Sequence, residues 1–247
     1  MKVVVIGGTG LIGSRLVAKL GEHGHEAVPA APNTGVNTLT GEGLAEVLES
    51  AAVVVDVSNS PSFADDPVME FFRTSTTNLL EYSAKAGVAH YVALSVVGTD
   101  RLVDSGYFRA KTVQETLIRE SGRSYSIVHA TQFYEFVKAI ADSSTIDGKI
   151  HLPPALIQPM AAEDVATGVG RVAMGEPLNG IREIGGPEQF RLDELVRKAL
   201  AAKGDPREVV TDEQARYYGV QLNERTLLPG PDAQLGEITF DDWLARQ

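Results

Sequence analysis

The stretch Val3-Val4-Val5-Ile6-Gly7-Gly8-Thr9-Gly10-Leu11-Ile12-Gly13 decides the fold that we expect for this chain of 247 residues. Its four consecutive β-branched residues predict a buried strand, and the glycines satisfy both GxxGxxG (7, 10 and 13) and GxGxxG (8, 10 and 13). Glycine permits a tight turn and lets the backbone approach a pyrophosphate, while the N-terminus of the following helix attracts the anion. The stretch therefore predicts a dinucleotide-binding loop in which residues 7–13 contact the cofactor.

The rest of the chain continues this alternation of strands and helices. We predict strands at 27–30, 53–57, 91–95, 125–129, 146–152 and 181–184, and helices at 12–22, 43–50, 68–86, 107–121, 162–174, 192–202 and 241–245. Strands separated by helices imply right-handed crossovers and a parallel sheet covered on both faces. We expect an α/β, Rossmann-like doubly wound sheet with a small C-terminal substrate lobe. Residues 1–247 would form one NAD(P)-binding unit, with a core at about 1–130, lobe elements at about 131–247 and a loop over 227–236.

Composition excludes several classes of function. The chain has no cysteine, which excludes disulfide scaffolds, thiol nucleophiles and Cys-ligated metal sites. It has 22 basic against 33 acidic residues and no dense basic run, which argues against nucleic acid or an anionic membrane surface as a partner. No apolar run reaches the roughly 18 residues of a membrane span, and the N-terminus has no signal-peptide layout. We therefore expect a cytoplasmic protein without a metal centre.

The end of the second predicted strand bears on the choice of dinucleotide. NAD-binding sites place an acid there to hold the ribose 2′-hydroxyl, but no acid occurs between Glu26 and Glu42. Asn33, Thr34 and Arg15 are the remaining candidate partners. Because no carboxylate would repel a 2′-phosphate, the sequence favours NADP(H) slightly over NAD(H).

A YxxxK motif, Tyr107 to Lys111, begins a predicted helix and supplies the catalytic candidates. The i, i+4 spacing places phenol and ammonium on one helical face, where the ammonium would stabilise a phenolate. Ser95 ends the preceding strand, where its hydroxyl would orient a substrate carbonyl. A second YxxxK, Tyr134 to Lys138, follows the strand at 125–129, and we interpret Tyr134 as lining the substrate pocket.

These motifs together resemble those of atypical, NmrA-like members of the short-chain dehydrogenase/reductase superfamily. The resemblance lies in residues 7–13, 90–98, 106–111, 130–133 and 185–188. It implies a dinucleotide at the carboxyl edge of the sheet, with Lys111 on the nicotinamide ribose. The other residues that it places near the cofactor are Ser58, Asn59, Ala130, Thr131, Gln132 and Phe133.

The chain departs from this family in one place and keeps a feature that many relatives lose. Phe72 stands where extended relatives carry an asparagine of their lysine-linked proton relay. Many NmrA-like relatives lose the catalytic tyrosine and act as redox sensors, so the retention of Ser95, Tyr107 and Lys111 favours an enzyme.

We therefore expect an NAD(P)H-dependent oxidoreductase that reduces a carbonyl or quinone-like small molecule, including an aromatic or polycyclic one. Tyr107 would donate the proton. The predicted substrate pocket consists of Val97, Gln132, Phe133, Tyr134, Phe136 and Met160. His129 ends a strand that faces the cleft, and a ligand contact and an ordinary core position are equally open for it.

Three alternatives remain open at this stage. One is a non-catalytic dinucleotide redox sensor that binds a protein partner. The others are an epimerase or isomerase and an accessory redox enzyme for aromatic hydroxylation. A monomer and a homodimer are both compatible with the sequence.

Overall fold

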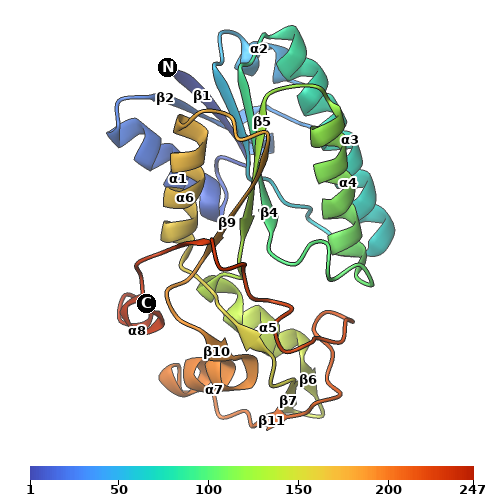
Figure 1. Ribbon diagram of the computed structural model, residues 1–247, viewed down its shortest axis with the longest axis vertical. Helices are drawn as coiled ribbons and strands as arrows, with labels where there is room; N and C mark the ends of the chain where they lie inside the picture. The colour runs from blue at the N-terminus through green and yellow to red at the C-terminus, as the bar shows by residue number, and fades with distance from the viewer.

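A computed structural model describes all residues from Met1 to Gln247, and its centre is a seven-stranded parallel sheet (Figure 1). The strands are β1 (Lys2–Ile6), β2 (Glu26–Ala30), β3 (Val53–Asp56), β4 (His90–Val96), β5 (Tyr125–Ala130), β9 (Gly180–Gly185) and β12 (Gln234–Leu235). They lie in the order β12-β9-β5-β4-β3-β1-β2, so the chain reverses its direction of winding beside β1. Such a reversal is where doubly wound sheets bind ligands. The predicted fold class is confirmed.

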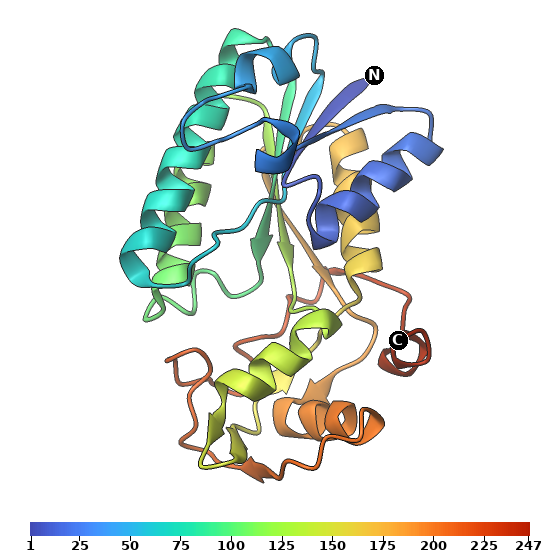
Figure 2. The ribbon, with the colours of Figure 1, turned by 180° about the vertical axis from the view of Figure 1, so that it is seen from behind.

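Helices cover both faces of this sheet (Figures 1 and 2). The helices α1 (Leu11–Glu22) and α6 (Ala162–Met174) lie on one face, and α2 (Leu44–Leu48), α3 (Asp65–Lys85) and α4 (Gly106–Glu120) lie on the other. In strand β1, residues 3–6 are all β-branched because both faces of the strand are covered. Val3 and Val5 pack toward α1 and α6, while Val4 and Ile6 pack with residues of α2 and α3. None of the helices combines the length and the apolarity that crossing a membrane requires.

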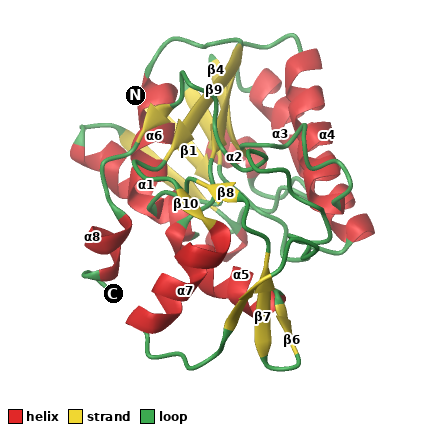
Figure 3. Ribbon diagram, turned by 60° about the horizontal axis from the view of Figure 1, so that its bottom comes forward, coloured by secondary structure: helices red, strands yellow, loops and turns green.

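A second group of elements lies at the carboxyl ends of the sheet strands, and Figure 3 views it with this end of the molecule turned forward. It contains α5 (Val137–Ser143), α7 (Leu192–Ala202), α8 (Phe240–Leu244), β6 (Thr145–Ile146), β7 (Lys149–Leu152), β8 (Leu156–Ile157), β10 (Phe190–Arg191) and β11 (Val209–Thr211). We call this group the lobe. Two short 3-10 turns complete the chain, η1 (Pro32–Thr34) and η2 (Tyr134–Phe136).

The structure corrects three sequence predictions. The strand predicted over 146–152 is a hairpin of β6 and β7, because Asp147 and Gly148 both adopt positive φ angles, 49° and 81°. The predicted loop over 227–236 contains β12, which pairs in parallel with β9. The sheet is also not confined to about 1–130, since α6, β9 and β12 all follow that boundary.

Candidate active site

The glycine loop joins β1 to α1 at the carboxyl edge of the sheet, and its glycines have different roles. A Cβ on Gly8 would lie 2.6 Å from the Cα of Pro29, and one on Gly13 would lie 2.1 Å from the carbonyl oxygen of Gly7. A Cβ on the exposed Gly10 would approach only the Gly7 oxygen, at 3.2 Å. Gly10 is the N-cap of α1, and no side chain caps this helix. Its first N–H groups are therefore open to an anion, as the predicted pyrophosphate site requires.

The end of β2 contributes one side chain to this loop. The hydroxyl of Thr9 donates to Oδ1 of Asn33 at 3.1 Å, so Asn33 lies against the glycine loop. The hydroxyl of Thr34 is committed to its own turn, where it accepts from the Ala31 amide and donates to the Ala31 carbonyl, both at 2.9 Å. Arg15 donates to the Leu11 carbonyl at 2.7 Å. Of the three candidate partners for the ribose, Asn33 alone has its side chain joined to the loop.

The residues after β3 form a wall beside the same loop. The backbone amide and the hydroxyl of Ser58 both donate to Oδ1 of Asp56, at 3.0 and 2.6 Å. A Cβ on Gly7 would lie 2.9 Å from the Ser58 backbone, which places the two segments in direct contact. Asn59 follows as an exposed residue.

The end of β5 contains polar atoms without partners. The hydroxyl of Thr131 and both polar atoms of the Gln132 amide are buried and form no hydrogen bond. An unpaired buried polar group costs roughly 1–3 kcal/mol, so such groups normally have a partner. These orphaned atoms fit a polar ligand at this edge, such as a carboxamide. With the open glycine loop, they make the site suited to a nicotinamide dinucleotide.

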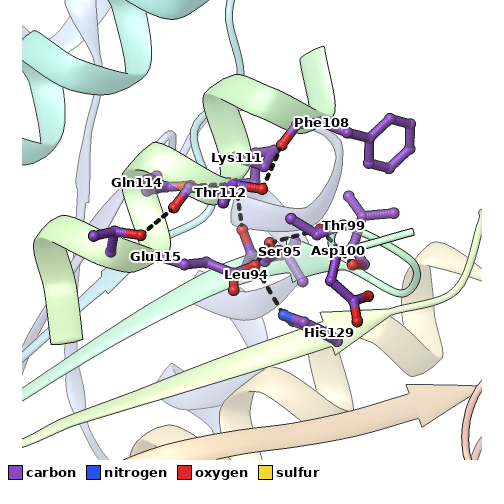
Figure 4. A network of polar contacts seen from close by, with 12 residues as sticks. Leu94, Ser95, Thr99, Asp100, Phe108, Lys111, Thr112, Gln114, Glu115 and His129 are labelled. Atoms are coloured by element: carbon purple, nitrogen blue, oxygen red, sulfur yellow. Dashed lines mark hydrogen bonds and ion pairs between the residues drawn. The ribbon is translucent and has the colours of Figure 1, made fainter. Parts of the chain in front are cut away.

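Lys111 is buried beneath α4, where polar side chains hold it (Figure 4). Its ammonium donates to the Leu94 carbonyl at 2.9 Å and to Oε1 of Gln114, whose amide nitrogen donates to Oδ2 of Asp56 at 3.0 Å. The Lys111 nitrogen also lies 4.5 Å from the centre of the Phe72 ring. Burial lowers the pKa of Lys111 to about 8, although the negative charges of Asp56 and Glu115 oppose this shift.

Tyr107 lies in an aromatic cage rather than beside an ammonium. Its ring centre is 5.5 Å from that of Phe63, 5.9 Å from Phe72 and 5.4 Å from Phe108. Burial raises the pKa of Tyr107 well above its usual value. The Lys111 ammonium bonds to Leu94 and Gln114 and forms no hydrogen bond with Tyr107, so the stabilisation of a phenolate by Lys111 stays a prediction. With its raised pKa, the phenol is protonated at neutral pH.

Ser95 belongs to a buried cluster that the sequence did not reveal. Its hydroxyl donates to Oε1 of Glu115 at 2.6 Å, and Nε2 of His129 lies 2.8 Å from the same oxygen. Burial alone would raise the pKa of Glu115, but the contacts with His129 and Ser95 and the charge of Lys111 outweigh it and lower that pKa. Glu115 stands four residues after Lys111 on the buried face of α4, and that spacing is the signal that could have identified it.

The predicted substrate pocket is only partly assembled. Phe133 and the exposed Phe136 stack with ring centres 5.3 Å apart. Tyr134 is fully buried among Phe240 and Trp243 of the lobe, and its interpretation as pocket lining stays a prediction. The remaining predicted pocket residues, Val97, Met160 and Gln132, are all buried.

Comparisons with known proteins support the fold. No family model matches the chain. The photosystem II assembly factor Ycf39 of Cyanophora paradoxa is 22% identical over 165 residues, which cover 59% of this chain and 51% of that protein. The match thus spans about half the length of this curated relative.

Solved structures match over nearly the whole chain. MoeE5 in complex with UDP-glucose and NAD has a TM-score of 0.77 at 17% identity and covers 99% of this chain and 96% of its own. DesIV, a dTDP-glucose 4,6-dehydratase from Streptomyces venezuelae with bound NAD, has a TM-score of 0.75 at 19% identity and covers 100% and 95%. The dTDP-4-dehydrorhamnose reductase of Bacillus anthracis in complex with NADP has a TM-score of 0.69 at 14% identity and covers 96% and 90%. At these identities the likeness shows the fold alone, and this fold is the one that the sequence predicts.

Proposed function

We propose that this chain, whose fold matches that of solved structures containing NAD or NADP, is an NAD(P)H-dependent oxidoreductase of a carbonyl or quinone-like small molecule. One observation carries the proposal. The open glycine loop and the unpaired polar atoms of Thr131 and Gln132 lie at the carboxyl edge of the sheet, where Ser95 is the penultimate residue of β4. Of the three similar structures described above, two contain NAD and one contains NADP, and all three have a fold similar to that of this chain.

Different residues at this edge would bind different parts of the dinucleotide. The first N–H groups of α1 would hold the pyrophosphate, and Asn33 would face the adenosine ribose. Thr131 and Gln132 would bind the carboxamide with their unpaired atoms. When bound, the reduced dinucleotide supplies the hydride. The lack of an acid after β2 favours NADP(H) slightly.

The protein supplies the proton and the orientation of the substrate. A phenol with a raised pKa keeps its proton at neutral pH, and this is the form that can donate to a developing alkoxide. Tyr107 can therefore act as the proton donor in a reduction. The stacked Phe133 and Phe136 offer an aromatic surface to a planar substrate.

Removing the Tyr107 hydroxyl tests the assigned role. We expect Tyr107→Phe to lose about 100-fold or more of its turnover with menadione or an aromatic ketone, since general acids contribute roughly 10²–10⁴-fold. Dinucleotide affinity, measured by calorimetric titration with NAD, NADH, NADP and NADPH, should stay nearly unchanged. Tyr134→Phe is the matched control, because this tyrosine belongs to the other YxxxK and its hydroxyl donates only to the Ile238 carbonyl, at 3.3 Å. Unchanged turnover of Tyr107→Phe would contradict the role.

A second candidate function is a dinucleotide-dependent binding protein without turnover. The polar atoms of Lys111 and Ser95 are hydrogen-bonded to neighbouring groups of the protein, and Tyr107 forms no hydrogen bond with the Lys111 ammonium. The sequence relative named above is an assembly factor. This candidate predicts tight dinucleotide binding and no turnover over a panel of quinones and ketones. Steady oxidation of NADPH by any member of that panel would exclude it.

A further inference from the structure

A chain of buried hydrogen bonds joins Ser95 to Glu115 and His129 (Figure 4). Glu115 and His129 line a cavity on the α4 face of the sheet. Oε1 of Glu115 receives the Ser95 hydroxyl at 2.6 Å and lies 2.8 Å from Nε2 of His129. A carboxylate can only accept, so the proton between Glu115 and His129 belongs to Nε2. Only 5% of the Glu115 side chain and 8% of the His129 side chain are exposed.

The far end of this chain opens into a polar cavity of about 670 Å³. Glu115 and His129 both line it, and Nδ1 of His129 has no protein partner. The segment that closes the cavity is fixed in place, because Arg101 donates to the Arg225 and Leu228 carbonyls at 3.2 Å each. Neither the glycine loop nor Tyr107 lines this cavity, so it is separate from the proposed dinucleotide site.

The other route for protons is closed in this protein. Phe72 stands where the resemblance expects an asparagine, and its ring faces the Lys111 ammonium. Lys111 is joined onward only to the Leu94 carbonyl and, through Gln114, to Asp56, which is also buried. Tyr107 has aromatic neighbours on several sides. Neither residue has a polar chain that leads to the cavity, whereas Ser95 has one.

We propose that Glu115 and His129 are positioning residues that supply protons from the cavity to Ser95, and that Ser95 thereby delivers a proton to the active site. This inference rests on the proposed reductase function. In this proposal the Glu115–His129 pair supplies protons to the active site in place of the lysine-linked proton relay that the resemblance implies for extended relatives.

The proton balance of one cycle is as follows. Cavity water protonates His129 at Nδ1, and the imidazolium passes its Nε2 proton to Glu115. Ser95 then rotates its own proton away from Glu115, gives it to the phenolate that Tyr107 becomes after protonating the product, and accepts the proton of Glu115. The bond broken at each step is an O–H or N–H bond, and one proton enters for each proton that leaves. Nδ1 then returns its proton to the cavity water, and Glu115, which also lines the cavity, takes one proton from that water and passes it to Nε2, so that the imidazole regains its Nε2–H form.

Several charged groups surround this pair and would shape its pH dependence. His129 pairs across the sheet with Glu183 of β9, and Arg119 lies 3.5 Å from the second oxygen of Glu115. The remaining charged groups that line the cavity or stand near the pair are Lys111, Asp56, Asp100, Arg101 and Arg225.

The decisive experiment compares Glu115→Gln with Glu183→Gln in the full-length protein loaded with NADPH and menadione. Glutamine keeps the shape of Glu115 and its capacity to accept from Ser95, but it cannot relay a proton. We expect its kcat to fall about 10- to 100-fold, with a larger solvent deuterium isotope effect, an altered pH profile and an unchanged KM. Glu183→Gln removes a carboxylate from the same cavity outside the chain and should stay within about two-fold of the wild type.

A double-mutant cycle shows whether Glu115 acts through Ser95. In the Ser95→Ala background, Glu115→Gln should cause little further loss, because the group that receives its proton is already absent. Fully additive losses in the two variants would overturn the proposal. An isotope effect and pH profile of Glu115→Gln identical to those of the wild type would also overturn it.

A second measurement is independent of turnover. The ¹⁵N chemical shifts of the His129 imidazole should show the Nε2–H tautomer in the wild-type protein, and an Nδ1–H tautomer would contradict the chain of hydrogen bonds. If the wild type turns over no probe, the proposed function fails and the relay falls with it. If the wild type is active and Glu115→Gln behaves identically, only the relay fails.

Discussion

Lys111 is a buried charged residue that contributes both to the packing of α4 and to the candidate active site. It is 2% exposed, and it carries its charge beneath α4. Its ammonium is held by the Leu94 carbonyl and Gln114, and the ring of Phe72 lies over it. Burial of a charge is unfavourable even when it is bonded, and the lowered pKa of Lys111 expresses this.

The pKa of Lys111 leads to a prediction about stability. Its pKa falls from an ordinary value near 10.5 to about 8 on folding, so the folded protein releases this proton first as the pH rises. Below pH 8 both states are protonated and the buried charge is destabilising, whereas above pH 8 the penalty is progressively relieved. Between pH 7 and 9.5 the wild-type free energy of unfolding should therefore rise by about 2 kcal/mol relative to that of Lys111→Met. Urea titrations at both pH values measure the difference.

The exposed Lys138 provides the control for this measurement, since it pairs only with Asp142 on the surface of α5. Lys138→Met should follow the pH dependence of the wild type. Parallel curves for Lys111→Met and the wild type would show that Lys111 is not buried as a cation.

At the scale of elements, the sequence predicted those strands and loops that are formed by one continuous run of buried or motif residues. The run at 3–6 was recognisable because both faces of β1 are covered, and the glycine loop because its position between strand and helix is specific. Strands β8, β10 and β12 escaped prediction because each has two residues and exists only through its tertiary partner. The placement of Ser95 in the site was predicted, but its bond to Glu115 was not, since it joins residues that are 20 positions apart.

The N-terminus of α6 forms another long-range contact that the sequence does not predict, with the segment that leads to α8. The Oδ2 atom of Asp164 accepts hydrogen bonds from the backbone amides of Glu237 and Ile238, both at 2.9 Å. It therefore ties the segment that leads to α8 onto the first turn of α6.

Removing this anchor should free that segment. We expect Asp164→Ala to lose about 1–3 kcal/mol, because two amides lose a charged acceptor, and to increase hydrogen exchange in residues 236–244. Mass spectrometry of the exchanged amides measures this. Glu163→Ala, in the same turn, removes an exposed ion pair with Lys19 and should have little effect. If residues 236–244 are equally protected from exchange in Asp164→Ala and Glu163→Ala, Asp164 does not hold this segment in place.

At the scale of the whole molecule, segments of the sheet and segments of the lobe alternate along the second half of the chain. The lobe contains residues on both sides of β9, and its cluster of apolar side chains includes Tyr134 near its start and Trp243 of α8. The candidate dinucleotide site lies at the carboxyl edge where these two parts meet. A ligand at this edge would therefore stabilise the folded protein as a whole.

Thermal unfolding tests this coupling. At a concentration of about 100 times its Kd, the preferred dinucleotide should add roughly 3 kcal/mol and raise the Tm by about 5–10 °C. Gly10→Glu is the control, because Gly10 has a φ of −82° that any residue can adopt, and its side chain would place a carboxylate in the phosphate cradle. This variant should fold normally and lose the shift. A Tm that none of the four nicotinamide dinucleotides changes would contradict the site.

The pairing of β12 with β9 also bears on how the protein is made. β9 leaves the ribosome long before β12, and until β12 arrives one edge of β9 has unpaired N–H and C=O groups. Such an edge is a template for strands of other nascent chains. During synthesis, this chain therefore depends on a segment of two residues to cover the edge that would otherwise recruit its neighbours.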